Sequence, residues 1–87
     1  MQVEVVKVVK LVEIVRLAAI INSDSKNKVT VDVHIWGSLK NFDLSIVSNK
    51  KANDKIEIYF DNVYFDNNER QEKIISLLEA YTNVNKV

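Results

Sequence analysis

The chain contains no cysteine, no proline and a single glycine among its 87 residues. Without cysteine it has no disulfide, no thiolate ligand for a metal ion and no thiol nucleophile, and it suits a reducing compartment such as the cytoplasm. With one glycine and no proline it has no glycine-rich phosphate-binding loop and no linker of the kind that these residues form. These absences exclude thiol-dependent enzymes, thiolate metal sites and glycine-rich phosphate-binding sites from the possible functions.

The chain also lacks an excess of charge of either sign. Lys plus Arg and Asp plus Glu number 12 each, so the formal net charge is zero. No overall field therefore steers the protein toward nucleic acid or an anionic membrane, and an acidic mimic of DNA is equally disfavoured. The hydrophobic fraction of 47% and the charged fraction of 28% are those of a globular protein. We expect a single domain, residues 1–87, with no membrane association.

The stretch from Lys28 to Ser48 has the alternation of a β-hairpin. Apolar and polar residues alternate through VTVDVHIW (29–36) and again through FDLSIV (42–47), which is typical of strands with one buried face. The register that gathers all apolar positions on one face pairs Ile35 with Phe42 and Val31 with Ile46. We expect Gly37 to supply the positive φ or the bulge that the turn requires.

The remaining segments predict a third strand and two helices. KIEIYFD (55–61) alternates as a strand, with Ile58 opposite Leu44 and Ile56 opposite Ile46. Residues 1–22 predict a helix, and DNNERQEKIISLLEAY (66–81) predicts a second that starts with a capping box of Asp66 and Glu69. The order α-β-β-β-α predicts an α+β fold, a three-stranded antiparallel meander covered on one face by two helices.

The first of these helices is apolar on more than one side. A charged residue stands at about every third position, so the charges drift around the helix and no uncharged run is long enough to span a membrane. The first six or so residues are rich in valine and could form either helix or strand. Surplus apolar surface on this helix predicts a homodimer contact through Val5, Val9 and Val12. Alternatively, the two helices bury both sides within the chain.

The hairpin region resembles a known set of proteins. The run IINSDSKNKVTVDVHIWGSLKNFDLSIV (20–47), together with KIEIYFDN (55–62), is similar to small proteins of unknown function encoded by phages and prophages of Gram-positive bacteria. Ser38 stands where their pattern commonly has His. The resemblance implies a phage origin and location in the cytoplasm of a bacterial host, and it carries over no site residue. The positions that fit the pattern are Gly37, Phe42, Asp43, Leu44 and Ile46.

The solvent face of the predicted sheet gathers polar and aromatic side chains. The expected registers place them in rows across the three strands, and a solvated face with cross-strand pairs is the simplest interpretation. One row contains His34, Asp43 and Tyr59, the next contains Asp32, Ser45 and Glu57, and Trp36 lies near the hairpin tip.

This face contains the residue types of three kinds of chemistry. Ser45, His34 and Asp43 have the residue types of a hydrolase triad, His34 with Asp43 or Asp32 could bind a metal ion, and Asp32 with Glu57 could act as acid and base. A flat sheet offers neither a pocket nor an oxyanion hole, and a single histidine without cysteine makes a weak metal site. We therefore expect no catalytic residue, no metal and no cofactor.

Protein binding is the function that this face favours. Trp36 and Tyr59 are residue types that anchor interfaces, and polar neighbours would form the rim. We predict a non-enzymatic protein-binding module whose partner is a host or phage protein, and the resemblance suggests modulation or inhibition of a host protein. The predicted partner-binding residues are Trp36, His34, Asp43, Tyr59, Asp32 and Glu57.

Nucleic-acid binding and a structural role in a virion are the alternatives. Double-stranded-RNA-binding domains have the same order of elements, but their last helix starts with basic residues, whereas this one starts with DNNE (66–69), which repels phosphate. A set of lysines at one end of the sheet could contact phosphates, although without arginine or interleaved aromatic residues a solvated loop end is the simpler interpretation. These lysines are Lys26, Lys28, Lys50, Lys51 and Lys55.

Overall fold

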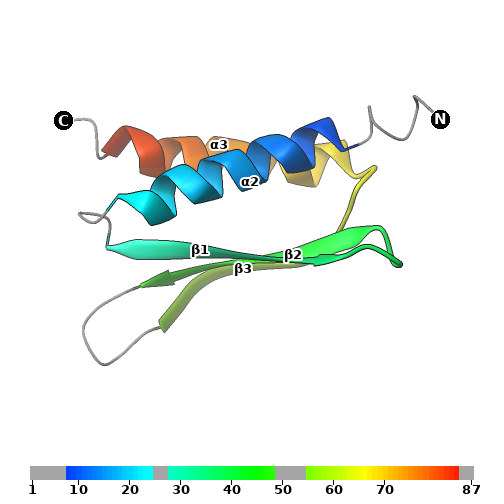
Figure 1. Ribbon diagram of the computed structural model, residues 1–87, viewed down its shortest axis with the longest axis horizontal. Coiled ribbons are helices and arrows are strands. Elements are labelled where there is room, and N and C mark those ends of the chain that lie inside the picture. The colour runs from blue at the N-terminus through cyan, green and yellow to red at the C-terminus, as the bar shows by residue number, and fades with distance from the viewer. Residues whose placement is uncertain (1–7, 25–27, 49–54, 85–87) are drawn as a thin grey trace.

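The computed structural model describes residues 8–24, 28–48 and 55–84. The fold is α-β-β-β-α, with a three-stranded antiparallel sheet of order β1-β2-β3, as the sequence predicted. Figure 1 shows the two helices lying together on one face of the sheet and running in the same direction, which leaves the other face open. The elements are α2 (Val9–Ser23), β1 (Val29–Trp36), β2 (Asn41–Ser48), β3 (Lys55–Tyr64) and α3 (Asn68–Val84).

The core lies between the helix layer and the inner face of the sheet. The central strand β2 contributes Phe42, Leu44 and Ile46, all fully buried. Buried positions on α2 and α3 recur every three or four residues, which is the spacing that keeps side chains on one side of a helix. The buried helix residues are Leu11, Ile14, Leu17, Ala18 and Ile21 on α2 and Gln71, Ile74 and Leu78 on α3. Among the described residues, no helix is long and apolar enough to cross a membrane.

The β1–β2 hairpin has the predicted register. Eight consecutive pairs run without interruption from Val29 opposite Ser48 to Trp36 opposite Asn41. The expectation for Gly37 was wrong, because the residue with positive φ is Lys40, at 55°. The turn closes with two hydrogen bonds, from the Leu39 N–H to the Trp36 carbonyl at 3.2 Å and from the Lys40 N–H to the Gly37 carbonyl at 3.2 Å. The left-handed residue is therefore the last one of the loop, not the first.

The predicted register of the third strand was wrong by two residues. Leu44 lies opposite Phe60 rather than Ile58, and Ile46 lies opposite Ile58. A shift of two keeps the same side chains on the inner face, so hydrophobic alternation alone does not distinguish the two registers. The strand also runs on to Tyr64, which places the fully buried Val63 opposite Phe42. This extension adds apolar contact at the end of the sheet that the shorter strand would leave open.

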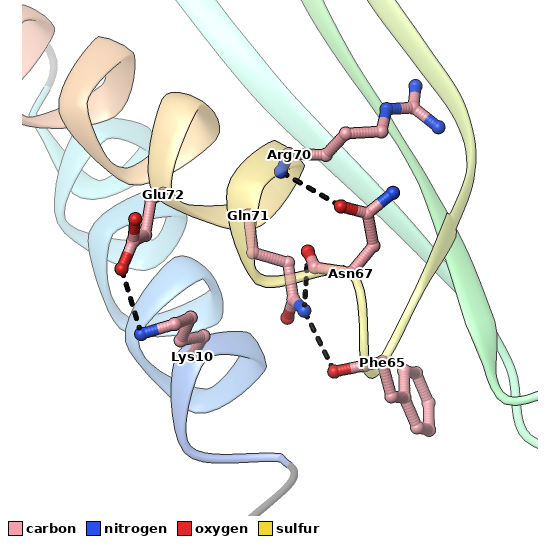
Figure 2. A network of polar contacts seen from close by, with 6 residues as sticks. All are labelled: Lys10, Phe65, Asn67, Arg70, Gln71 and Glu72. Atoms are coloured by element: carbon pink, nitrogen blue, oxygen red, sulfur yellow. Dashed lines mark hydrogen bonds and ion pairs between the residues drawn. The ribbon is translucent and has the colours of Figure 1, made fainter.

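A side-chain network ties the end of β3 to the start of α3 (Figure 2). The buried Gln71 donates from Nε2 to the backbone carbonyls of Phe65 at 2.8 Å, Asn67 at 3.1 Å and Tyr64 at 3.3 Å. These bonds satisfy carbonyl groups in the connection where regular backbone pairing ends. Gln71 thus fixes the angle at which the chain leaves the sheet.

The start of α3 differs from the predicted capping box. Asn67 is the residue before the helix, and its Oδ1 accepts the Arg70 N–H at 3.1 Å. The cap is therefore one residue later than Asp66, because β3 extends to Tyr64 and the connection occupies the residues that the prediction gave to the helix. Figure 2 also shows the ion pair of Lys10 with Glu72, at 3.3 Å, which joins the N-terminal parts of the two helices.

Candidate functional site

The candidate site is the outer sheet face, which we define as the side of the sheet away from the helices. Since successive side chains of a strand point to opposite faces, the strands place there Asp32, His34 and Trp36 from β1, Asp43 and Ser45 from β2, and Tyr59 from β3. Figure 1 shows that neither helix covers this side. The structure therefore exposes the polar and aromatic face that the sequence predicted.

Asp43 is the organising residue of this face. Its Oδ1 accepts the backbone N–H of Asn62 at 2.9 Å, and its Oδ2 accepts the indole Nε1–H of Trp36 at 3.2 Å. The pKa of Asp43 lies below its usual value, chiefly because of the Asn62 hydrogen bond; desolvation opposes this effect, and the Trp36 hydrogen bond makes a smaller contribution that lowers the pKa. Asn62 has a φ of 51°, and the ladder between β2 and β3 is irregular beside it. The bulge thus turns a backbone N–H of β3 toward the carboxylate.

Two aromatic side chains stand on the outer sheet face beside this carboxylate. Trp36 is 44% exposed and stacks on the His34 ring, with ring centroids 4.8 Å apart and an interplanar angle of 16°. Tyr59 is 56% exposed. Desolvation raises the pKa of the Tyr59 hydroxyl, and the negative charges of Asp43 and Asp61 raise it further. The indole of Trp36 is thus held in place by Asp43 and His34 while part of the side chain remains exposed.

The predicted rows across the sheet are only partly correct. His34 lies opposite Asp43 as expected, but Tyr59 pairs with Ser45, so that Ser45 is not beside Glu57. The two-residue shift of β3 carries Glu57 toward the far end of the sheet, where it is exposed. Five of the six predicted partner-binding residues thus lie around one region, and Glu57 lies apart from them.

A shallow depression of about 150 Å³ lies at the middle of the outer sheet face. Sites for small molecules occupy roughly 300 to 1,000 Å³, so this depression is small for a substrate. Both oxygens of Asp43 already accept hydrogen bonds from Asn62 and Trp36, whereas a catalytic triad needs this carboxylate to orient His34. The depression is lined by Asp32, Val33, His34, Asp43, Leu44, Ser45 and Tyr59.

The part of the chain that the structure describes contains no group of side chains arranged to bind a metal ion. No group of three or more His, Asp or Glu side chains within residues 8–24, 28–48 and 55–84 is placed to share a metal ion. His34 and Asp43 are neighbours, but the bonds that hold Asp43 leave it directed toward Trp36 and Asn62.

The predicted self-association residues on α2 are exposed. Val9 is 60% exposed and Val12 is 62% exposed, while Val5 lies outside the described residues. The alternative, in which both sides of the helix are buried within the chain, is therefore wrong for Val9 and Val12. Homodimerisation itself stays a prediction.

The predicted lysine set is described only in part. The register places Val29, Ser48 and Lys55 side by side, so Lys28 and Lys55 belong to the same end of the sheet. Lys26, Lys50 and Lys51 lie outside the described residues. The first turn of α3 contains the acidic Glu69, as expected from the sequence.

Asn22 makes a contact with β1 that the sequence pattern did not predict. This residue in the last turn of α2 accepts the Val31 N–H on Oδ1 at 2.8 Å and donates from Nδ2 to the Val31 carbonyl at 2.8 Å. Its amide thus pairs with β1 as a neighbouring strand would. Only the packing of α2 over β1 reveals this role, because asparagine near a helix end is common for other reasons.

Acid titration should reveal the role of Asp43. A carboxyl whose folded pKa is depressed stabilises the folded state above its unfolded pKa, and this contribution is lost as the pH falls through the folded pKa. Trp36 is the only tryptophan, so its fluorescence reports directly on the Asp43 hydrogen bond. We expect an emission change with a midpoint below 3.8, the ordinary value of the carboxyl.

The change should be absent in Asp43→Asn and present in Asp32→Asn, which alters a neighbouring carboxylate that is not bonded to Trp36. A midpoint at or above the ordinary value, or equal titrations in both variants, would contradict this role of Asp43.

Comparisons of the chain with protein-family models, with curated proteins and with solved structures find no match.

Proposed function

We propose that this protein is a small non-enzymatic binding module that docks another protein on its outer sheet face. The observation that supports this most is the pair of exposed aromatic residues, Trp36 and Tyr59, beside a carboxylate that holds the indole in place. Large aromatic side chains supply much of the binding energy at protein interfaces. A flat face of this kind is better suited to contact with the surface of another protein than to binding a small substrate.

The indole is held in position before any partner arrives. Trp36 donates to Asp43 and stacks on His34, so little side-chain freedom remains to be lost on binding. Ordering a side chain at an interface costs about 0.5 to 1.5 kcal/mol. A partner that covers Trp36 is spared most of that cost, which favours this residue as an anchor.

The charges on this face indicate the kind of partner. The described carboxylates there are Asp32 and Asp43, with Asp61 near Tyr59 and Glu57 toward the far end of the sheet. Of the basic residues, Lys28 and Lys40 lie beyond the two ends of β1, and Arg70 lies at the β3 edge, where it donates to the Asp61 carbonyl. Complementary charge accelerates association and selects among partners. We therefore propose a partner surface with Lys or Arg around an apolar recess for Trp36. The resemblance to phage proteins supports a host protein as this partner, encountered in the bacterial cytoplasm.

A capture experiment with three versions of the chain tests this function. Wild-type protein, the double variant Trp36→Ala with Tyr59→Ala, and Val9→Ala are immobilised and exposed to a lysate of a Gram-positive host. Val9→Ala also removes exposed apolar surface, but from the helix layer. We expect a specific protein, identified by mass spectrometry, on wild type and on the control, and a loss of about thirtyfold or more with the double variant.

Circular dichroism of each variant checks that the fold persists, and Tyr59→Ala alone serves if the double variant unfolds. A wild-type chain that retains no specific protein, or one that retains the same protein as the double variant, would refute the proposal.

A further inference from the structure

The two edge strands of the sheet, β1 and β3, differ in how many of their outward N–H and carbonyl groups are hydrogen-bonded. On β3, Asn62 bulges and its N–H bonds to Asp43, while Arg70 Nη1 donates to the Asp61 carbonyl at 3.0 Å and to the Asn62 carbonyl at 3.3 Å. Bulges and covering side chains are the devices by which proteins protect a sheet edge from further pairing. The β3 edge is therefore protected near its end.

Within the described residues, the β1 edge is protected at Val31 but not at Val33 and Ile35. Its eight residues pair with β2 without a bulge and include no proline, glycine or lysine. Asn22 satisfies the outward N–H and carbonyl of Val31. Because backbone groups of alternate residues point to the same side of a strand, the N–H and carbonyl of Val33 and Ile35 also point away from β2. Within the described residues, no hydrogen bond from another segment reaches them.

The helix layer extends beyond this open edge. Two helices side by side are about 20 Å wide, whereas three strands at about 4.8 Å spacing cover only about 14 Å. Asn22 reaching from α2 to the outward groups of Val31 places α2 above the edge. Val15 lies two turns before Asn22 on the same side of the helix, about 10 Å along it, which is level with His34 and Ile35.

Apolar side chains therefore flank the open part of the edge. Ile35 lies on the inner face of the sheet yet is 48% exposed, and Val15 on α2 is 41% exposed. These two side chains and the backbone of Val33 and Ile35 form what we call the β1 groove. Its backbone would hydrogen-bond a strand, and its side chains would pack against that strand from above.

We propose that the β1 groove binds an extended segment of another protein, which adds to the sheet as a fourth strand beside β1. The occupant has apolar side chains at alternate positions, directed toward Val15 and Ile35, and polar or basic side chains between them, next to Asp32. This mode of recognition takes affinity from main-chain hydrogen bonds and specificity from alternate side chains.

A second copy of this chain does not fit the same place by antiparallel pairing. Antiparallel pairing of two β1 strands keeps both helix layers on one face and would bring the two α2 helices, each lying above its own β1, to within about the strand spacing of 4.8 Å. Packed helices need about 8 to 10 Å between their axes. An extended segment with no helix above it meets no such obstacle.

Selection of short peptides tests this proposal. A display library of random peptides is selected against the immobilised wild-type chain, and the recovered sequences should alternate apolar with polar or basic residues. A synthetic peptide of the selected sequence should protect the amides of Val33 and Ile35 from hydrogen exchange. Binding should weaken at least about tenfold in Val33→Pro, which removes an outward N–H, and in Ile35→Lys.

Leu39→Lys is the matched control for Ile35→Lys, because it adds the same charge at an exposed apolar residue of the turn. Trp36→Ala should leave this binding unchanged, which separates the β1 groove from the outer sheet face. If Val33→Pro does not fold, the Ile35→Lys variant and the hydrogen-exchange data test the proposal without it.

The proposal is overturned by a selection that recovers nothing or recovers sequences without alternation. It is also overturned by binding that survives Val33→Pro and Ile35→Lys, or by exchange protection elsewhere than Val33 and Ile35. Light scattering that finds a dimer of the intact chain, converted to monomer by the same two variants, would assign the groove to a second copy instead.

Discussion

Replacing Leu44 by alanine is expected to lower the free energy of unfolding by about 3 to 4 kcal/mol. Leu44 is fully buried in the central strand, between Val33 on one side and Phe60 on the other. Truncation removes apolar contact and leaves a cavity that a sheet fixed on both sides does not close. A chain of this length has a total stability of about 4 to 13 kcal/mol, so the loss is a large part of it.

Leu39→Ala is the matched control, since it is the same chemical change at a turn residue that is 60% exposed. Its effect should stay within about 0.5 kcal/mol. Urea unfolding followed by circular dichroism measures both variants. Equal losses for the two, or a loss below about 1 kcal/mol for Leu44→Ala, would show that β2 is not the centre of the core.

The substitution Gln71→Glu is expected to destabilise the fold by about 3 kcal/mol or more at pH 7. Gln71 is fully buried, and its amide donates to the carbonyls of Tyr64, Phe65 and Asn67. A carboxylate of the same shape places a buried negative charge against these oxygens and removes every one of the three bonds.

The effect of Gln71→Glu should depend on pH. Burial and the facing carbonyls raise the folded pKa of the introduced carboxyl above its unfolded value of about 4.3. A raised carboxyl pKa costs stability above that unfolded value, and the cost diminishes as the pH falls and the neutral acid forms. Denaturant unfolding of the variant and wild type at pH 7 and near pH 4 should therefore show a smaller difference at the lower pH.

Gln71→Met keeps the length of the side chain without a charge, so its cost should be about 1 to 3 kcal/mol and independent of pH. A Gln71→Glu variant as stable as wild type at pH 7 would mean that this network does not fix the junction of β3 and α3.

The β1–β2 hairpin could be predicted from the sequence because apolar and polar residues alternate through 29–36 and again through 42–47. A slip of one residue would expose Val31, Leu44 and Ile46 together, and the structure has the register that avoids this. The same pattern placed His34 opposite Asp43 and put Trp36 on the outer face. The exposure of Val9 and Val12 also followed from a helix with apolar residues on more than one side.

The register of the third strand could not be predicted in the same way. Registers that differ by two residues present the same side chains to the core, so alternation left the choice open, and the structure pairs Val63 with Phe42 at the sheet end. That choice moved Glu57 away from the candidate site and brought the Asn62 N–H to Asp43. The hydrogen bonds that hold the outer sheet face together could not be read from alternation.

The order of elements, the inner and outer faces of the strands and the surplus apolar surface of α2 were determined by the sequence itself, since periodicity and composition act locally along the chain. Only the tertiary structure decided the register of β3, the pairing of Asn22 with Val31 and the contrast between the two sheet edges. These features depend on which segments, distant in sequence, come to lie side by side, and packing between layers settles that after the local patterns have formed.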